Sequence, residues 1–157
     1  MALYPVAGCK IYISTNLFPE QSADVVAGDF TSVVWLEIGK WTQMGAYGDA
    51  AQLISTDLIG EGRTKKQKGT KNAGSMANTF ATDVSNTGQQ KLLTAAGSYD
   101  NYAFKVELND KITTINSTRL FYGLVMSAQQ AGGGANTVQT LNATVEINSN
   151  IVATAAS

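Results

Sequence analysis

Five basic side chains lie within nine positions of the segment GEGRTKKQKGTKNAGSMANTF, which runs from residue 60 to residue 80. They are Arg63, Lys65, Lys66, Lys68 and Lys71. Closely spaced cations attract carboxylates or phosphates. A long polar loop inside a compact domain commonly reaches a partner or covers a site. We therefore weigh three roles for this segment: a solvated surface, an arm that docks on another subunit, and a contact with a phosphate backbone.

A nucleotide-binding loop is excluded by the same residues. Aligned on Gly69, the phosphate-binding pattern G-x-x-x-x-G-K-[ST] requires glycine at position 64, lysine at 70 and serine or threonine at 71, where the chain has Thr64, Thr70 and Lys71. Such a loop must also open into a helix whose first amides hold the phosphate. Strand-like sequence follows here instead, so the physical requirement is missing too.

Residues for catalysis or metal binding are sparse. The chain has no histidine, and its single cysteine, Cys9, lacks both an imidazole to activate it and a second cysteine for a disulfide. The carboxylates lack the compact D-x-D-x-D-G spacing of a calcium loop, which favours solvated turns over an acid–base pair or a metal site. We expect no enzyme activity, no metal and no cofactor. The carboxylates concerned are Asp24, Asp29, Asp49, Asp57, Asp83, Asp100, Glu107 and Asp110.

Two tryptophans, Trp35 and Trp41, lie in an alternating segment. On a surface they would form a stacking platform for a sugar or a base, but in alternating sequence tryptophan more often lies in a core or an interface. We expect these two to pack in the core or between subunits. A carbohydrate-binding or virion-decorating sandwich that uses them is an alternative, which glycan binding by the monomer would support.

Charge is distributed unevenly along the chain. Of 11 basic and 12 acidic residues, residues 60–71 hold five bases and one acid, so the remainder keeps six bases against eleven acids. An acidic body with a basic segment suits head-to-tail association of like subunits, and it equally suits a nucleic-acid contact. No aromatic residue lies between Arg63 and Lys71 to stack on bases, which argues against a sequence-specific reader of DNA or RNA.

The bulk composition predicts a single domain over residues 1–157. Only 15% of residues are charged, against about 25% in an ordinary soluble domain. This is either ordinary variation or a sign that surface is buried between copies, because interface cores are depleted in charge. The N-terminus lacks a signal-peptide pattern, and no apolar run approaches about 18 residues. We expect a soluble protein made in the cytosol, without a membrane span.

Alternation of apolar and polar residues predicts a mainly β protein. A long basic loop is expected at 60–74, and the last residues, 153–157, are expected to be frayed. The segments Phe18 to Asp29 and Gly132 to Gly134 have the composition of loops. The eight strand candidates are Lys10 to Ser14, Val33 to Ile38, Gln52 to Ile59, Ser75 to Thr82, Tyr102 to Asn109, Lys111 to Asn116, Thr118 to Ser127 and Thr137 to Ile147.

One helix is predicted at 86–96. Asn86 has the side chain of an N-cap, Gln89 follows three positions later as in a capping box, and Gly97 is placed to end the helix. At roughly eleven residues it would be marginal alone in water and must pack on the sheet.

The strand candidate at 118–127 is apolar on both faces. Phe121 and Val125 oppose Leu120 and Tyr122, so we expect cover on both sides from a helix, a second sheet or a neighbouring subunit. Phe121 and Val125 therefore join Trp35 and Trp41 as candidates for intersubunit contact or packing.

The order of these elements resembles the major tail tube proteins of long-tailed bacteriophages. The stretch KNAGSMANTFATDVSNTGQQKLL is similar to the part of that family in which a polar loop leads into a strand and then a helix. YDNYAFKVELND resembles the strand that follows, and LFYGLVMSAQQAGGGANTVQTLNATVEIN resembles the closing pair of strands. The resemblance covers nearly the whole chain and contains no catalytic motif.

This resemblance implies a β-sandwich or barrel-like antiparallel sheet with one flanking helix. It also implies a homohexameric ring, and rings that stack into a hollow tube through which DNA passes without specific binding. Arg63, Lys65, Lys66, Lys68 and Lys71 would contact the adjacent ring, away from the lumen. The implied partners are tape-measure and tail terminator or tip proteins, in the tail of a virion made in host cytoplasm.

Two alternatives stay open beside this resemblance. Type VI secretion tubes and gene transfer agents share the architecture, so the resemblance does not select the machine. The main alternative from another class is a nucleic-acid-binding β domain that uses residues 63–71 as a phosphate clamp.

Overall fold

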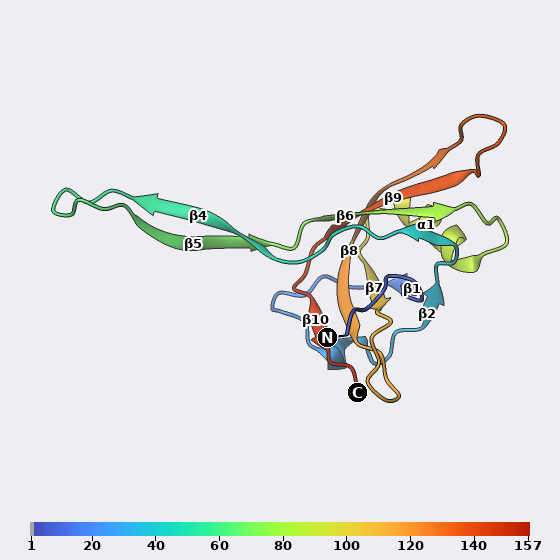
Figure 1. The fold of residues 1–157 in the computed structure, drawn as a ribbon, viewed down its shortest axis with the longest axis horizontal. Coiled ribbons are helices and arrows are strands. Elements are labelled where there is room, and N and C mark those ends of the chain that lie inside the picture. Colours follow the sequence, from blue (N-terminus) through green and yellow to red (C-terminus); the bar gives the residue numbers. More distant parts are fainter. Residues whose placement is uncertain (1) are drawn as a thin grey trace.

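The computed structural model describes residues 2–157, which form a mainly β protein with one α-helix and one short 3-10 helix (Figure 1). One curved antiparallel sheet has the strand order β2-β1-β7-β8-β9-β6-β3, with β10 also paired to β8, and β4 and β5 form a separate two-stranded sheet. The elements are β1 Lys10–Leu17, η1 Ala27–Phe30, β2 Trp35–Glu37, β3 Trp41–Gln43, β4 Ala50–Thr56, β5 Lys65–Asn72, β6 Ser75–Ala81, α1 Thr87–Ala96, β7 Tyr102–Glu107, β8 Thr118–Ala131, β9 Thr140–Ile147 and β10 Val152–Thr154.

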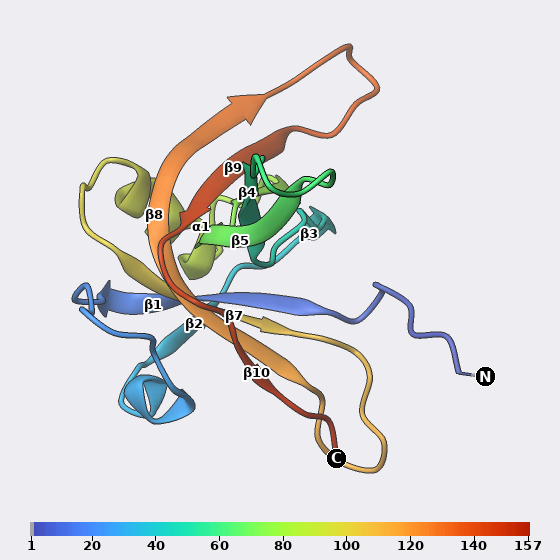
Figure 2. The ribbon, with the colours of Figure 1, turned by 90° about the vertical axis from the view of Figure 1, so that its left-hand side faces the viewer.

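The large sheet curls on itself like an open barrel. Strands β2 and β3 lie at opposite ends of the strand order, yet only residues 38–40 separate them in sequence. Four Cα steps from Glu37 to Trp41 reach at most about 14 Å. The two ends of the sheet must therefore come close together, and Figure 2 shows the strands curving around a common interior. We call residues 38–40 the seam.

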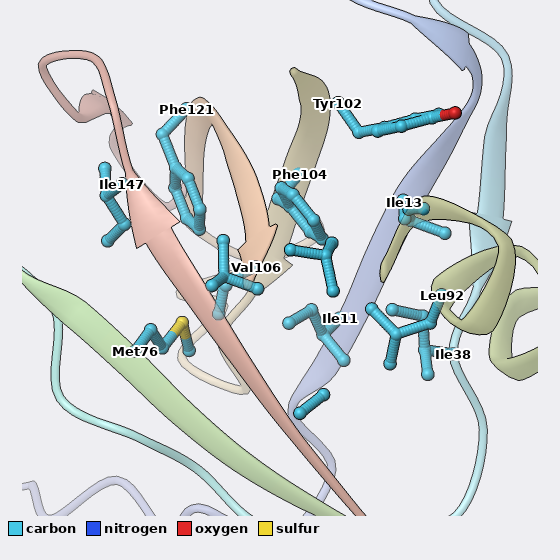
Figure 3. Packing of buried hydrophobic residues seen from close by; sticks show 14 of the residues in the cluster. Ile11, Ile13, Ile38, Met76, Leu92, Tyr102, Phe104, Val106, Phe121 and Ile147 are labelled. Carbon is cyan, nitrogen blue, oxygen red and sulfur yellow. The ribbon is translucent and has the colours of Figure 1, made fainter. Parts of the chain in front are cut away.

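Aromatic and aliphatic side chains fill the interior of this barrel (Figure 3). Phe104 and Phe121 are fully buried and their rings stack at 5.7 Å. Leu92 of α1 lies beside Ile38 of the seam, so the helix covers an open side of the barrel. Burial of this kind, at about 25 cal/mol per Å² of apolar surface, is the main term that stabilises the large sheet and α1, which we call the body.

A second cluster covers the outer face of β7 and β8. Phe18 stacks on Phe30 of η1 at 5.0 Å and on Tyr122 of β8 at 5.2 Å. The segment between β1 and β2 thus covers the outer side of β8, while the barrel interior covers the side that carries Phe121. The expectation that this strand is covered on both faces is confirmed, and the cover comes from the same chain.

The caps of α1 fasten the helix to the seam. Asn86 Oδ1 accepts hydrogen bonds from Gln89 N at 2.9 Å and from Gly39 N at 3.3 Å. Gln89, 3% exposed, donates through Nε2 to Gly39 O and Ala81 O, both at 2.9 Å. Gly88 allows the close approach, because a Cβ there would lie 2.1 Å from Glu37 O. The predicted helix is confirmed, with Asn86 as its N-cap and Gly97 as its C-cap. The predicted capping box is wrong, because Gln89 Oε1 accepts from Asp83 N and not from Asn86 N.

Three sequence-based assignments of local structure are wrong. Most of the expected loop 60–74 is strand β5, which pairs antiparallel with β4. Residues 111–116 form no strand, because Asn116 Oδ1 and the carboxylate of Asp110 hold the chain in a turn. The expected frayed end, 153–157, is held: β10 pairs with β8, and Ser157 N donates to Ile115 O.

Strand limits also differ from the expectation. Within residues 2–157 the structure has ten strands where the sequence suggested eight. The additions are β5, β10 and β3, a three-residue edge strand paired with β6. Strand β8 continues to Ala131, beyond the expected limit at residue 127, and β2 is shorter than expected. No helix in the described part of the chain is long and apolar enough to cross a membrane.

Candidate functional site

The β4–β5 hairpin, which we call the arm, projects far from the body (Figure 1). All seven residues of β4 are exposed, and seven of the eight residues of β5 are exposed. Apolar side chains are included, with Leu53 67% exposed and Ile59 at the tip fully exposed. Neither outer edge of the arm pairs with another strand of the described chain. The arm therefore presents side chains and backbone that its own body does not cover.

The register of the arm places three lysines on one face. Lys68 lies opposite Leu53, and Lys66 lies opposite Ser55, so these side chains share a face. Lys71 lies opposite Ala51, two positions from Leu53 on the same face of β4. In a regular strand, residues 68 and 71 would point to opposite faces. A β-bulge between these two pairs adds one residue to β5 and brings Lys71 to the same face.

The opposite face of the arm is nearly neutral. Ile54 lies opposite Gln67, and a Cβ on Gly69 would touch the Ile54 side chain at 3.2 Å. Lys65 is on this face, but its Nζ lies 3.1 Å from Glu61 Oε2 in the one salt bridge among residues 2–157. Of the five predicted basic residues, Lys66, Lys68 and Lys71 are therefore gathered on one face without a carboxylate partner. We call these three side chains the lysine face.

A groove of about 960 Å³ lies at the root of the arm. Three separate segments contribute carboxylates to its lining: Asp24 from the segment after β1, Asp49 before β4, and Glu146 of β9. Asp24 and Asp49 are exposed and accept no hydrogen bond from the described residues. Glu146 accepts a hydrogen bond from the Ser75 hydroxyl. We call this feature the root groove; sequence reasoning missed it, because its walls come from segments far apart in the chain.

The rest of the root groove is lined by polar side chains and by the apolar Ala50, Ala51, Ala73 and Ile147. Asn150 is held by hydrogen bonds to the backbone of Val25, at 2.8 Å from Val25 N and 3.0 Å to Val25 O. Lys71 and Asn72 form the arm side of the groove. The groove thus holds three carboxylates against one lysine, and this net negative charge suits a partner that carries positive charge.

The aromatic and aliphatic candidates are part of the body. Phe121 and Val125 are 0% and 4% exposed and lie in the core. Trp41 is half-buried and stacks on Phe80 at 6.3 Å, and Trp35 is half-buried and stacks on Phe30 at 6.4 Å. Their packing within the chain is visible. Contact with another subunit stays a prediction for all four, and only the tryptophans retain exposed surface for it.

Titratable groups with shifted pKa values lie outside the arm. Burial, together with the negative charges of Glu107 and Glu37, raises the pKa of Tyr12 to about 12. Hydrogen bonds from the side chain and the backbone of Ser117 lower the pKa of Asp110. The Ser85 side chain and backbone lower the pKa of Asp83 in the same way. Each shift has a local structural cause in a strand pair or turn.

Among residues 2–157, no three His, Cys, Asp or Glu side chains are arranged to hold a metal ion. Cys9 is half-buried and unpaired. The clearest feature for interaction is therefore the arm together with the root groove.

Solved structures with a similar fold belong to tail and injection assemblies. A chain of the PVC extracellular contractile injection system, in its sheath/tube terminator assembly, matches with a TM-score of 0.70 and 10% identity over 99% of each chain. A chain of the anti-feeding prophage baseplate matches with a TM-score of 0.67 and 11% identity over 99% of this chain and 98% of that one. The SPP1 tail tube matches with a TM-score of 0.62 and 12% identity over 96% of this chain and 80% of that one.

At sequence identities this low, the structural matches establish a shared fold and no more. The tail tube fold expected from the sequence is confirmed over nearly the whole chain. No family model matches the sequence, and no curated protein matches it either.

Proposed function

We propose that this protein is the structural subunit of a tail tube. Copies assemble into hexameric rings, and the rings stack into a hollow tube that conducts DNA to a host. The whole-chain likeness to tube and injection-system proteins supports this proposal. The protein acts through assembly, without an enzymatic step.

The arm is the single observation that carries the proposal. An isolated two-stranded hairpin is at best marginally stable in water, and an exposed strand edge is a ready template for pairing. This arm also exposes Leu53 and Ile59. Such a feature makes a free monomer prone to aggregation, but it gives a subunit a surface that can bind further copies. The basic residues 63–71 then serve contacts between rings.

A tube that conducts DNA must not hold it tightly. Lysines lining the lumen would bind phosphates and release counterions, with an affinity that grows with each added contact. We therefore place Arg63, Lys65, Lys66, Lys68 and Lys71 at contacts between rings, away from the lumen. Tape-measure and tail terminator or tip proteins complete the proposed assembly, which belongs to the tail of a virion. The likeness to contractile injection systems leaves an injection tube as the closest variant of this role.

Negative-stain microscopy of concentrated purified protein tests the proposal. Rings or hollow rods are the expected result, and a monomer at every accessible concentration would contradict it. The matched variant replaces residues 52–70 with Asn-Gly. Ala51 and Lys71 lie directly opposite each other in the arm, so a two-residue turn closes the shortened hairpin. This variant should fold as the parent does and form no rods.

Nucleic-acid binding by the arm is the second candidate function. Three lysines on one face favour it, because each phosphate contact adds to affinity. Against it, the rest of the chain outside residues 60–71 carries eleven acids and six bases. DNA binding by the purified protein over a salt series discriminates the two: a steep loss of affinity with added salt, and no rods, would favour the phosphate clamp.

A further inference from the structure

We infer that the lysine face of the arm docks in the root groove of a second copy of this chain. The inference rests on the proposed function, because it names the surface to which the arm binds. It starts from the register of the arm, which gathers Lys66, Lys68 and Lys71 around the exposed Leu53.

The lysine face forms no salt bridge within the described chain, although Lys71 lines the root groove of its own molecule. Only the root of the arm lines the groove, through residues 50–52 and 70–72. Lys66 lies five residues beyond Lys71 along β5, or about 17 Å at the rise of an antiparallel strand. A lysine side chain does not span that distance, so Lys66 reaches a root groove only on another molecule.

The root groove has the complementary chemistry. Asp24 and Asp49 are free of hydrogen bonds within the described chain, and Glu146 adds a third carboxylate to the lining. Complementary charge steers two surfaces together and fixes their register more than it adds affinity. Leu53, in the middle of the lysine face, supplies apolar contact area. Lys66 and Lys68 on one partner and Asp24 and Asp49 on the other carry opposite charges, which pair without an ion or a ligand between them.

The resulting contact is head-to-tail. The arm of one copy and the groove of the next are different surfaces, so each copy keeps one arm and one groove for further copies. A contact of this kind generates closed rings or open filaments rather than isolated dimers.

Reciprocal charge reversal tests the inference in the full-length protein. The arm variant is Lys66→Glu with Lys68→Glu, the groove variant is Asp24→Lys with Asp49→Lys, and a third protein carries all four substitutions. Lys10→Glu with Lys111→Glu and Glu20→Lys with Glu37→Lys are controls that make the same changes in net charge at exposed positions elsewhere. Circular dichroism and thermal melting establish that every variant folds, and rods are counted by negative-stain microscopy.

Either double variant alone should raise the protein concentration needed for rods by at least about tenfold, because each opposes like charges at the contact. An equal mixture of the two should form rods, since each acidic arm meets a basic groove and each basic arm an acidic one. The quadruple variant should also form rods by itself, and the controls should behave as the parent does.

The outcomes separate this inference from the proposed function. Rods from the parent with no rescue in the mixture or the quadruple variant would overturn the root groove as the receptor while leaving the tube intact. Normal rods from the arm variant would do the same, and if that variant also lost binding to a short DNA duplex, the lysine face would be assigned to nucleic acid. A parent protein that never assembles would overturn both proposals.

Discussion

The body and the arm of this protein are built on opposite principles. In the body, strands share a sheet, aromatic rings stack, and buried amides are hydrogen-bonded. In the arm, two strands pair only with each other, and nearly every side chain is exposed. The body covers its own apolar side chains, whereas the arm leaves its side chains and both outer strand edges uncovered. Stability and interaction are thus assigned to different parts of one short chain.

This separation has an energetic consequence. Replacing a large side chain by a small one lowers the free energy of unfolding most where the side chain is fully buried, and least where it is exposed. The body should therefore respond to substitution through the free energy of unfolding. The arm should respond through assembly alone.

The same substitution placed in both regions gives the largest expected contrast. Leu141 of β9 is 1% exposed in the core, and Leu53 of β4 is 67% exposed. Leu141→Ala should lower the free energy of unfolding by about 2–5 kcal/mol through lost burial and a cavity. Leu53→Ala should change it by less than about 0.5 kcal/mol. Urea denaturation of the monomer measures both, and an equal loss in the two variants would refute the division between body and arm.

The next largest change in the free energy of unfolding is expected at Gln89, whose hydrogen bonds join α1 to the seam. Gln89→Leu keeps the approximate size of the side chain but leaves Gly39 O, Ala81 O and Asp83 N without their side-chain partner. Unsatisfied buried polar groups cost about 1–3 kcal/mol each before relaxation, so we expect a net loss of about 2–3 kcal/mol.

Gln90→Leu is the matched control for this position. Gln90 is the next residue of the helix and is exposed, with one hydrogen bond to Val84 O. The control should lose less than about 1 kcal/mol in the same denaturation experiment. A similar loss in both variants would mean that Gln89 does not join the helix to the seam.

The body was largely predictable from sequence because its signals are local. Alternation in Tyr102 to Asn109 predicts the strand β7, and Asn86 predicts the start of the helix. The three-residue strands β2, β3 and β10 were poorly predicted or missed, because alternation needs more residues to be visible. Pairing of these strands with β1, β6 and β8 decides where they form, and pairing of distant residues leaves no local pattern.

The strands of the arm could not all be predicted in this way, and the reason is physical. Strand β5, KKQKGTKN, buries no face, so no apolar alternation marks it, and polar composition suggested a loop. The five basic residues were found from composition alone. Their sorting into a lysine face depends on the bulge, and the root groove depends on three segments that meet only in the fold. Neither feature has a signature in the sequence.

Amide hydrogen exchange compares the free energy of local opening in the arm with that in the body. Amides of β4 and β5 in the monomer should exchange through local opening that costs less than about 1 kcal/mol, since little apolar burial holds them. Amides of β9, paired on both sides by β8 and β6, should approach the global free energy of unfolding. Assembly into rods should slow exchange in the arm more than in β9. Strong protection of the arm already in the monomer would contradict its dependence on other copies.

The smallest effect concerns alkaline stability of the body, through Tyr12. Burial, then the charges of Glu107 and Glu37, raises the pKa of this phenol from 10.0 to about 12, and its hydroxyl donates to Glu107 at 3.3 Å. Between about pH 10 and pH 12 the unfolded chain loses this proton while the folded chain keeps it. The contribution of Tyr12 to stability is therefore complete below pH 10 and is lost as the pH rises toward 12.

Tyr12→Phe removes the titrating group, so the fall in unfolding free energy over that pH range should become shallower. Tyr99→Phe, at a side chain that is 99% exposed, is the control and should leave the slope as in the parent. Denaturant titrations of the monomer at a series of alkaline pH values measure the slopes, and identical slopes in the parent and Tyr12→Phe would refute the assignment. Because Tyr12 lies in the body, the variant should form rods at neutral pH as the parent does, which separates a change in folding from a change in assembly.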